Sequence, residues 1–214
     1  MSVLRHLPNI LTFARIPAVA LIAWWTYLAG PWASAALALF IAAAVTDLLD
    51  GWIARKLGAV SDFGRLMDAL VDKIFILGLL VAMLALGCLP VREVAAGSGL
   101  AAAASPLASL VAALGVFLIL TREFLITGLR LVAAAKGQVL EAEGWGKSKT
   151  FLQILAIGHL IGLRAYETHW KLSAEWHARW EVIITGLFWA SVALTVWSGA
   201  VYLFRHRRHL PGIA

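Results

Sequence analysis

Five aspartates lie between residues 46 and 73, and no other part of the chain contains one. Four of them form two pairs with helical spacing, since Asp47 and Asp50 are three residues apart and Asp68 and Asp72 are four apart. Residues at these spacings share one face of a helix. Each pair therefore presents two carboxylates on one helical face.

Small residues lie on the same faces as these carboxylates. At about 100° per residue, Gly51 and Ala54 fall on the face of the first pair. Gly64 lies one turn before Asp68, on the face of the second pair. Because such residues leave room beside the carboxylates, the two segments predict a ligand site rather than a solvated surface.

The chemistry that fits this site is metal binding. Clustered carboxylates repel one another, and a single charge at the middle of a bilayer already costs ~2.5–3.5 kcal/mol. Oxygen ligands suit hard divalent cations such as Mg²⁺ or Mn²⁺. Two such ions can hold a diphosphate and stabilise the attacking and leaving oxygens of a displacement. We therefore expect Asp47, Asp50, Asp68 and Asp72 to bind two divalent ions; the alternative, helix capping at a membrane boundary, suits Asp62 better.

The composition is that of an integral membrane protein. The chain has 214 residues, of which 62% are hydrophobic, and a mean hydropathy of +0.86. We expect one domain, residues 1–214. The net charge of +6 suits anionic lipid headgroups, and no nucleic-acid partner is expected. A single cysteine excludes an internal disulfide.

The predicted fold is an all-α bundle of six transmembrane helices, preceded by a short interfacial segment at residues 1–8. The hydrophobic runs lie at about 9–29, 33–56, 65–89, 107–135, 148–165 and 181–204. The first run lacks a small-residue cleavage site and is expected to be retained. If both termini are cytosolic, all but four of the 18 Lys and Arg lie on the cytosolic side. The positive-inside rule therefore favours this orientation, which also puts the aspartates on the cytosolic side.

Two further stretches carry charge into apolar helices. Arg15 lies one turn inside the first run, where an arginine either pairs with an anion or extends to the interface; both readings stay open. Asn9 and Thr12 precede it and, taken alone, suit helix capping. In the fourth run, Arg122 and Arg130 lie two turns apart within about 80° around the helix.

Together with Lys147 and Lys149, these two arginines form a basic patch on the predicted cytosolic side. A bound phosphate explains the patch better than a rim of lipid anchors does, because unpaired cations in apolar helix are costly. We expect Glu123 to pair with one of the two arginines. A metal-bound donor and a basic patch together indicate an acceptor that carries phosphate.

The aspartate stretch resembles the signature of the CDP-alcohol phosphotransferase family. Its fixed positions are Asp47-x-x-Asp50-Gly51-x-x-Ala54-Arg55, eight residues, and then Gly64-x-x-x-Asp68-x-x-x-Asp72. The resemblance implies that the four aspartates bind two divalent metal ions and that Asp72 also serves as the base. It assigns to CDP-diacylglycerol binding Asn9, Thr12, Gly51, Ala54, Arg55, Ser61 and Gly64.

Residues 121–130, TREFLITGLR, and 145–150, WGKSKT, resemble a branch of this family, the phosphatidylglycerophosphate synthases. That resemblance implies sn-glycerol 3-phosphate as the acceptor, whose phosphate would bind Arg122, Arg130, Lys147 and Lys149. At the family level it also implies a homodimer in a bacterial inner membrane. Two rivals stay open: another acceptor (inositol phosphate, serine or phosphatidylglycerol), and a divalent-cation transporter lined by the aspartates.

The loop at residues 164–180 combines two histidines with three tryptophans. A metal site built from His169, His177 and a glutamate is conceivable. An aromatic belt at the outer membrane surface is the favoured interpretation.

Overall fold

The computed structural model of the chain describes residues 2–57, 62–89, 106–135, 137, 145–171 and 173–207. Side chains are described for residues 10, 12–47, 67–89, 106–135, 137, 148–171 and 173–207.

The described residues form six α-helices, one π-helical turn and no strand, which confirms the all-α prediction. In chain order they are α1 (Ser2–Leu28), α2 (Pro31–Leu57), α3 (Asp62–Ala85), α4 (Pro106–Ala135), α5 (Trp145–Ala165), the π-turn η1 (Tyr166–Trp170) and α6 (Ala174–His206). Within the described ranges, α4 and α6 are long and apolar enough to cross a membrane, judged by length and composition.

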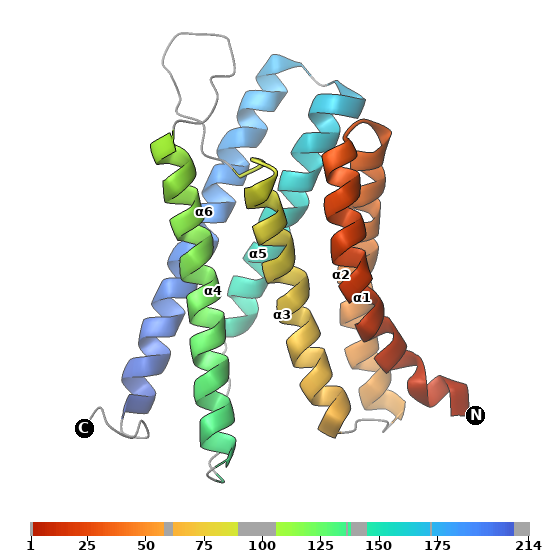
Figure 1. Ribbon diagram of the computed structural model, residues 1–214, viewed down its shortest axis with the longest axis vertical. Helices are drawn as coiled ribbons and strands as arrows, with labels where there is room; N and C mark the ends of the chain where they lie inside the picture. Colours follow the sequence, from red (N-terminus) through yellow and green to blue (C-terminus); the bar gives the residue numbers. More distant parts are fainter. Residues whose placement is uncertain are drawn as a thin grey trace. The chain divides into compact units, whose positions relative to one another are not determined.

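The helices follow the predicted apolar runs closely at α4 but extend beyond them at α1 and α6. The start of α1 is a correction, because the helix begins at Ser2 and runs through Pro8 and Asn9. Figure 1 shows the first turns of α1 bent away from the rest of that helix. A proline inside a helix removes one backbone hydrogen bond and bends it, but does not prevent helix on its N-terminal side. Asn9 and Thr12 therefore lie within α1 and do not begin it.

Contacts between residues divide the chain into two compact units. Unit 1 comprises Met1–Cys88 and Ile157–Val182, and unit 2 comprises Leu89–Ala156 and Ile183–Ala214. The aspartate signature belongs to unit 1, and the predicted basic patch belongs to unit 2. Both α5 and α6 contribute residues to each unit.

In unit 1, α1 packs against both α2 and α3 (Figure 1). The rings of Phe40 and Phe75 stack between α2 and α3 with their centroids 5.7 Å apart. A Cβ atom on Gly78 would lie 3.1 Å from Cγ1 of Val19, so the glycine permits the close approach of α1 and α3. Aromatic and glycine packing thus fix the three helices that carry the aspartates and Arg15.

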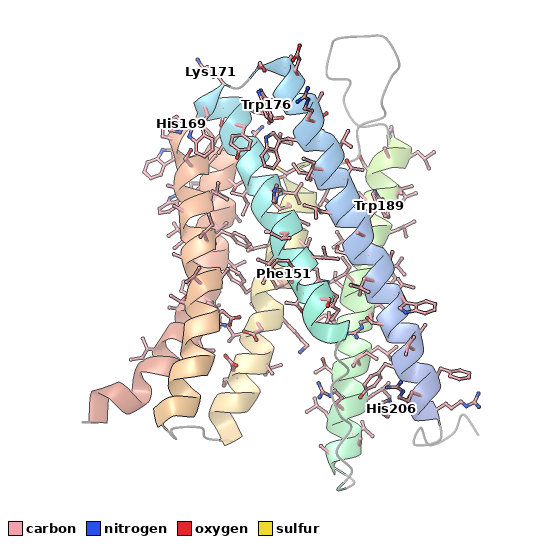
Figure 2. All side chains as sticks on the ribbon, turned by 180° about the vertical axis from the view of Figure 1, so that it is seen from behind. Phe151, His169, Lys171, Trp176, Trp189 and His206 are labelled. Carbon is pink, nitrogen blue, oxygen red and sulfur yellow. The ribbon has the colours of Figure 1, made fainter. Side chains whose placement is uncertain are left out.

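Hydrogen bonds tie unit 1 together at the turn between α1 and α2. The amide of Gly30, a turn residue with a φ of 57°, donates to Oγ1 of Thr168 at 2.8 Å. Ser34 Oγ and His169 Nδ1 are 2.7 Å apart. Figure 2 shows His169, Lys171 and Trp176 gathered at this end, which we call the tied end of unit 1.

The histidines of this loop do not form the metal site considered above. Nε2 of His177 lies 2.9 Å from Oε1 of Glu167, and His169 contacts Ser34. No three potential metal ligands come together here among the described residues. Aromatic rings do gather at the tied end, where Tyr166 packs against Trp170 and Trp180.

Candidate active site

The site begins where the buried stripe of α2 changes from apolar to acidic. Ala33, Ala36, Phe40 and Ala43 are buried at alternating spacings of three and four residues, as expected for one face of a packed helix. The next position in this series is Asp47. The stripe that packs the core therefore directs the Asp47 carboxylate toward the neighbouring helices.

The buried face of α3 also changes from apolar to acidic residues. Met83, Leu79 and Phe75 are buried on one face of this helix. Asp72 and Asp68 continue the series toward its N-terminus, again at spacings of three and four. Because α2 ends at Leu57 and α3 begins at Asp62, the two acidic ends are brought to the same end of unit 1.

Helix α1 contributes the third stripe. Ile22 and Thr26 are fully buried, and about two to three turns before Ile22, Arg15 is 2% exposed and Thr12 is 6% exposed. Burying a charged group is costly unless it is paired. The polar end of this stripe therefore has to meet a partner on α2 or α3.

The three polar ends meet in one cluster. One carboxylate oxygen each from Asp47, Asp68 and Asp72 lies within 4.8 Å of the other two. The side chains of Asp47 and Asp72 are 32% and 44% exposed, so the cluster is open to a ligand. Carboxylate oxygens at this separation, drawn from two helices, suit a hard divalent cation. This is the only such group of three ligands among the described residues.

Arg15 and Thr12 connect α1 to these carboxylates. Nη1 of Arg15 pairs with Oδ1 of Asp47 and donates to Oδ1 of Asp72 at 2.6 Å. Oγ1 of Thr12 donates to Oδ1 of Asp68 at 3.5 Å, a long bond. Of the two readings left open for Arg15, the structure supports pairing with an anion, and the anion is the aspartate cluster.

The other predicted donor-site residues are only partly described. The backbone positions of Asn9, Asp50, Gly51, Ala54, Arg55 and Gly64 lie in helices α1, α2 and α3, while their side chains lie outside the described set. Ser61 lies outside the described residues altogether. Because α2 is continuous through Leu57, Asp47 and Asp50 lie on one helix, as their spacing predicted.

In unit 2, the predicted basic patch is built around a buried glutamate. Nζ of Lys149 pairs with Oε1 of Glu123, and Nη1 of Arg122 lies 3.2 Å from the same oxygen. Nη2 of Arg122 also donates to Oγ of Ser198 at 3.3 Å. This confirms the expected pairing of Glu123 with an arginine, and it adds Lys149 as a second partner.

The sequence patterns did not reveal how α6 supports this network. A Cβ atom on Gly199 would lie 2.8 Å from Cγ of Arg122, so only a glycine lets the arginine lie against α6. Nε2 of Gln153 donates to Oγ1 of Thr195 at 3.3 Å, which links α5 to α6. The signal that could have indicated this packing is the Ser-Gly pair at 198–199 inside an apolar helix.

Of the two remaining members of the patch, only Arg130 has a described side chain. Arg130 is exposed on α4, and the side chain of Lys147 lies outside the described set. Arg122 and Lys149 therefore form the described core of the patch, and Glu123 balances part of their charge.

The chain is similar to known proteins over most of its length. A model of the CDP-alcohol phosphatidyltransferase family matches residues 5–197. The chain is 33% identical over 202 residues to CDP-diacylglycerol–glycerol-3-phosphate 3-phosphatidyltransferase 1, chloroplastic/mitochondrial, of Arabidopsis thaliana, which covers 92% of this chain and 61% of the relative. It is 32% identical over 214 residues to a probable phosphatidylglycerophosphate synthase of Mycobacterium tuberculosis, at 98% and 86% coverage.

A cardiolipin synthase (CMP-forming) of Oryza sativa is 33% identical over 208 residues, at 94% coverage of this chain and 57% of the relative. The chain therefore spans less than two thirds of the length of these two plant relatives. All three similarities cover the aspartate cluster and the basic patch, because each includes more than nine tenths of the chain.

Proposed function

The chain belongs to the CDP-alcohol phosphatidyltransferase family, and we propose that it transfers the phosphatidyl group of CDP-diacylglycerol to sn-glycerol 3-phosphate. The products are phosphatidylglycerophosphate and CMP, and the role is phospholipid synthesis. The observation that carries the proposal is the cluster of Asp47, Asp68 and Asp72, which are signature positions of this family. The names of the Arabidopsis and Mycobacterium relatives support the acceptor.

The cluster fits divalent metal ions. Its donors are all carboxylate oxygens from two helices, which is the ligand chemistry that Mg²⁺ and Mn²⁺ prefer. We propose that Asp47, Asp50, Asp68 and Asp72 hold two such ions. When bound, the ions supply positive charge to the diphosphate of the donor and to its leaving oxygen.

In the proposed reaction, Asp72 acts on the hydroxyl group of the acceptor. We propose that its carboxylate orients the primary hydroxyl of glycerol 3-phosphate and takes its proton as the oxygen attacks the β-phosphorus. The new bond joins that oxygen to phosphorus, the bond from phosphorus to the CMP oxygen breaks, and CMP leaves. Arg55 balances the charge on CMP, and the other donor contacts come from Asn9, Thr12, Gly51, Ala54, Ser61 and Gly64.

The phosphate of the acceptor is assigned to Arg122, Arg130, Lys147 and Lys149. In the described part of the patch, Arg122 and Lys149 share Glu123 as a carboxylate partner. A phosphate oxygen can replace one of these contacts, because guanidinium and ammonium groups bind both anions. Another phosphorylated alcohol, such as inositol phosphate, fits the same chemistry, and the rice relative is named for a different product.

We further propose a single membrane domain with six spans, both termini in the cytosol and the aspartates facing the cytosol. Its N-terminal turns lie along the interface, where basic residues attract anionic lipids. The family resemblance supports a homodimer in a bacterial inner membrane.

The test is CMP release by the full chain, purified in detergent, with CDP-diacylglycerol, Mg²⁺ or Mn²⁺ and one candidate acceptor at a time. We expect CMP and phosphatidylglycerophosphate with glycerol 3-phosphate alone. CMP release only with a different alcohol would support the aspartate site and contradict glycerol 3-phosphate as the acceptor. Cation flux across vesicles without CMP release would replace the transferase with a transporter.

A further inference from the structure

Arg15 is the most deeply buried charge among the side chains that meet at the aspartate cluster. It comes from α1, is 2% exposed and contacts carboxylates of two other helices, Asp47 on α2 and Asp72 on α3. One nitrogen, Nη1, makes both contacts. The guanidinium therefore lies between the two helices, where it offsets the repulsion of two negative charges.

Asp47 and Asp72 are also proposed metal ligands. A guanidinium and a metal ion bound to the same carboxylates would repel each other, which costs free energy. A divalent ion binds carboxylate oxygens at about 2.0–2.1 Å if it is Mg²⁺. Nη1 lies 2.6 Å from the Asp72 oxygen, so a bound ion and the guanidinium would be neighbouring positive charges. Such like charges repel strongly when they are partly shielded from water.

We propose that Arg15 is an exchangeable counterion of the metal site. In the metal-free protein it holds the carboxylates of Asp47 and Asp72 together. It withdraws from them when a divalent ion binds, and its guanidinium then pairs with the diphosphate of the donor. This inference rests on the metal site of the proposed function and assigns to Arg15 a positioning role within it.

The chemistry of the side chain supports both positions. A guanidinium binds carboxylate and phosphate groups with similar geometry, and its long stem allows it to move while the backbone of α1 stays in place. Thr12, one turn away, contacts Asp68 separately, so α1 keeps a contact with the cluster when Arg15 withdraws. When the anionic donor pairs with Arg15, the carboxylates of Asp47 and Asp72 become available to bind the metal. Donor and metal should therefore strengthen each other's binding.

The test is direct titration of Mn²⁺ into the full chain in detergent, with free Mn²⁺ measured by electron paramagnetic resonance. Without nucleotide, Arg15→Gln should bind Mn²⁺ at least about tenfold more tightly than wild type, or ~1.4 kcal/mol. CDP should tighten Mn²⁺ binding to wild type, and it should do so less in Arg15→Gln. In the presence of a chelator, Arg15→Gln should unfold at a lower temperature than wild type. The aspartates then have neither a metal ion nor a guanidinium to offset their repulsion.

Arg164→Gln is the matched control. It removes the same charge from unit 1, but Arg164 pairs with Glu167 near the tied end. Its Mn²⁺ affinity should equal that of wild type. Arg15→Lys keeps a positive charge and should give intermediate affinity, so it provides the test if Arg15→Gln does not fold.

Equal or weaker Mn²⁺ binding by Arg15→Gln, or by Arg15→Lys in its place, would overturn the inference, because Arg15 would then organise the site rather than compete for it. That outcome leaves the proposed function intact if wild type binds Mn²⁺ and releases CMP. Wild type that binds no Mn²⁺ while Asp47→Asn behaves identically would remove the metal site and the inference together. CMP release measured separately distinguishes these cases.

Discussion

The aspartates of the cluster differ in their contacts with α1 and in their exposure. Asp68 accepts a bond from Thr12, whereas Asp47 and Asp72 share Arg15. Asp72 is also the more exposed of the two that pair with Arg15, at 44% against 32%. Its carboxylate is therefore the better placed of these two to meet an acceptor that arrives from outside the cluster.

Asp72→Asn tests this role. Removing a base that acts in the transition state should lower CMP release by at least ~10²-fold. Nucleotide binding should remain within a few-fold of wild type, because the other aspartates still hold the metal. Turnover with glycerol 3-phosphate and binding of CDP by calorimetry give the two readings.

Asp62→Asn is the matched control, since it makes the same change at the aspartate predicted to cap α3, and it should retain turnover. Loss of nucleotide binding with normal turnover at saturating donor would contradict the assignment of Asp72 as the base.

Glu123 provides the corresponding test in the basic patch. It is the carboxylate partner of buried Lys149 and of Arg122, and removing one partner of a buried pair costs about 3–5 kcal/mol. Glu123→Gln should therefore lower the unfolding temperature in buffer without anions. Inorganic phosphate should restore it more strongly than in wild type, because the unpaired cations then gain a partner.

Thermal unfolding across a phosphate titration measures both effects. Glu181→Gln removes the same charge from the unit 1 part of α6, beside His177, and should respond to phosphate as wild type does. If Glu123→Gln also responds only as wild type, the patch does not bind phosphate.

At the scale of helices, the approach of α4 to α6 depends on Gly199. A Cβ atom there would lie 2.8 Å from Cγ of Arg122, close to the backbone of α4 rather than at the mobile end of the side chain. Arg122 would have to shift away from Ser198, to which it donates a hydrogen bond. The packing of two helices thus sets the position of Arg122, one of the cations proposed to bind the acceptor phosphate.

Gly199→Ala should therefore raise KM for glycerol 3-phosphate by about tenfold, equivalent to ~1.4 kcal/mol, with little change in KM for CDP-diacylglycerol. Gly186→Ala is the control on the same helix, because no atom lies within 4 Å of its Cβ position. It should leave both constants unchanged and slightly stabilise the helix. Equal effects of the two substitutions would show that Gly199 matters only for helix propensity.

Helices and ligand faces were predictable from sequence because both depend on local spacing. The apolar run at 107–135 predicted α4 almost to the residue, and the spacing of Asp68 and Asp72 predicted their shared face. The start of α1 was not predictable, since proline is usually found in the first turn and here lies well inside the helix. The partner of Arg15 depended on which helices α1 packs against, and no local pattern contains that information.

At the scale of the whole chain, the proposed orientation requires the loop at 164–180 to lie outside and the C-terminal end of α6 to lie inside. Ser173 and Arg207 are exposed at these two places, and Cys88 is the single native thiol. In a Cys88→Ala background, Ser173→Cys should react with a membrane-impermeant maleimide in intact cells. Arg207→Cys should react only after permeabilisation.

The two cysteine variants serve as controls for each other, because each should be labelled fully once the membrane is opened. Labelling of Arg207→Cys in intact cells would reverse the proposed orientation. Labelling of both variants in intact cells would contradict the single span that the proposed topology places between Ser173 and Arg207.

Helix α2 is held at the tied end of unit 1 and carries Asp47 farther along its length. At the start of α2, the amide of Gly30 donates a hydrogen bond to Oγ1 of Thr168, and Oγ of Ser34 lies 2.7 Å from Nδ1 of His169. Asp47 lies sixteen residues along α2 from Pro31, a distance of about 24 Å at 1.5 Å per residue. Over that length, a tilt of only about 2° moves the carboxylate by ~0.8 Å. The movement from a tilt of this size would exceed the difference between the 2.6 Å contact of Arg15 with Asp72 and a Mg²⁺–oxygen contact of about 2.0–2.1 Å.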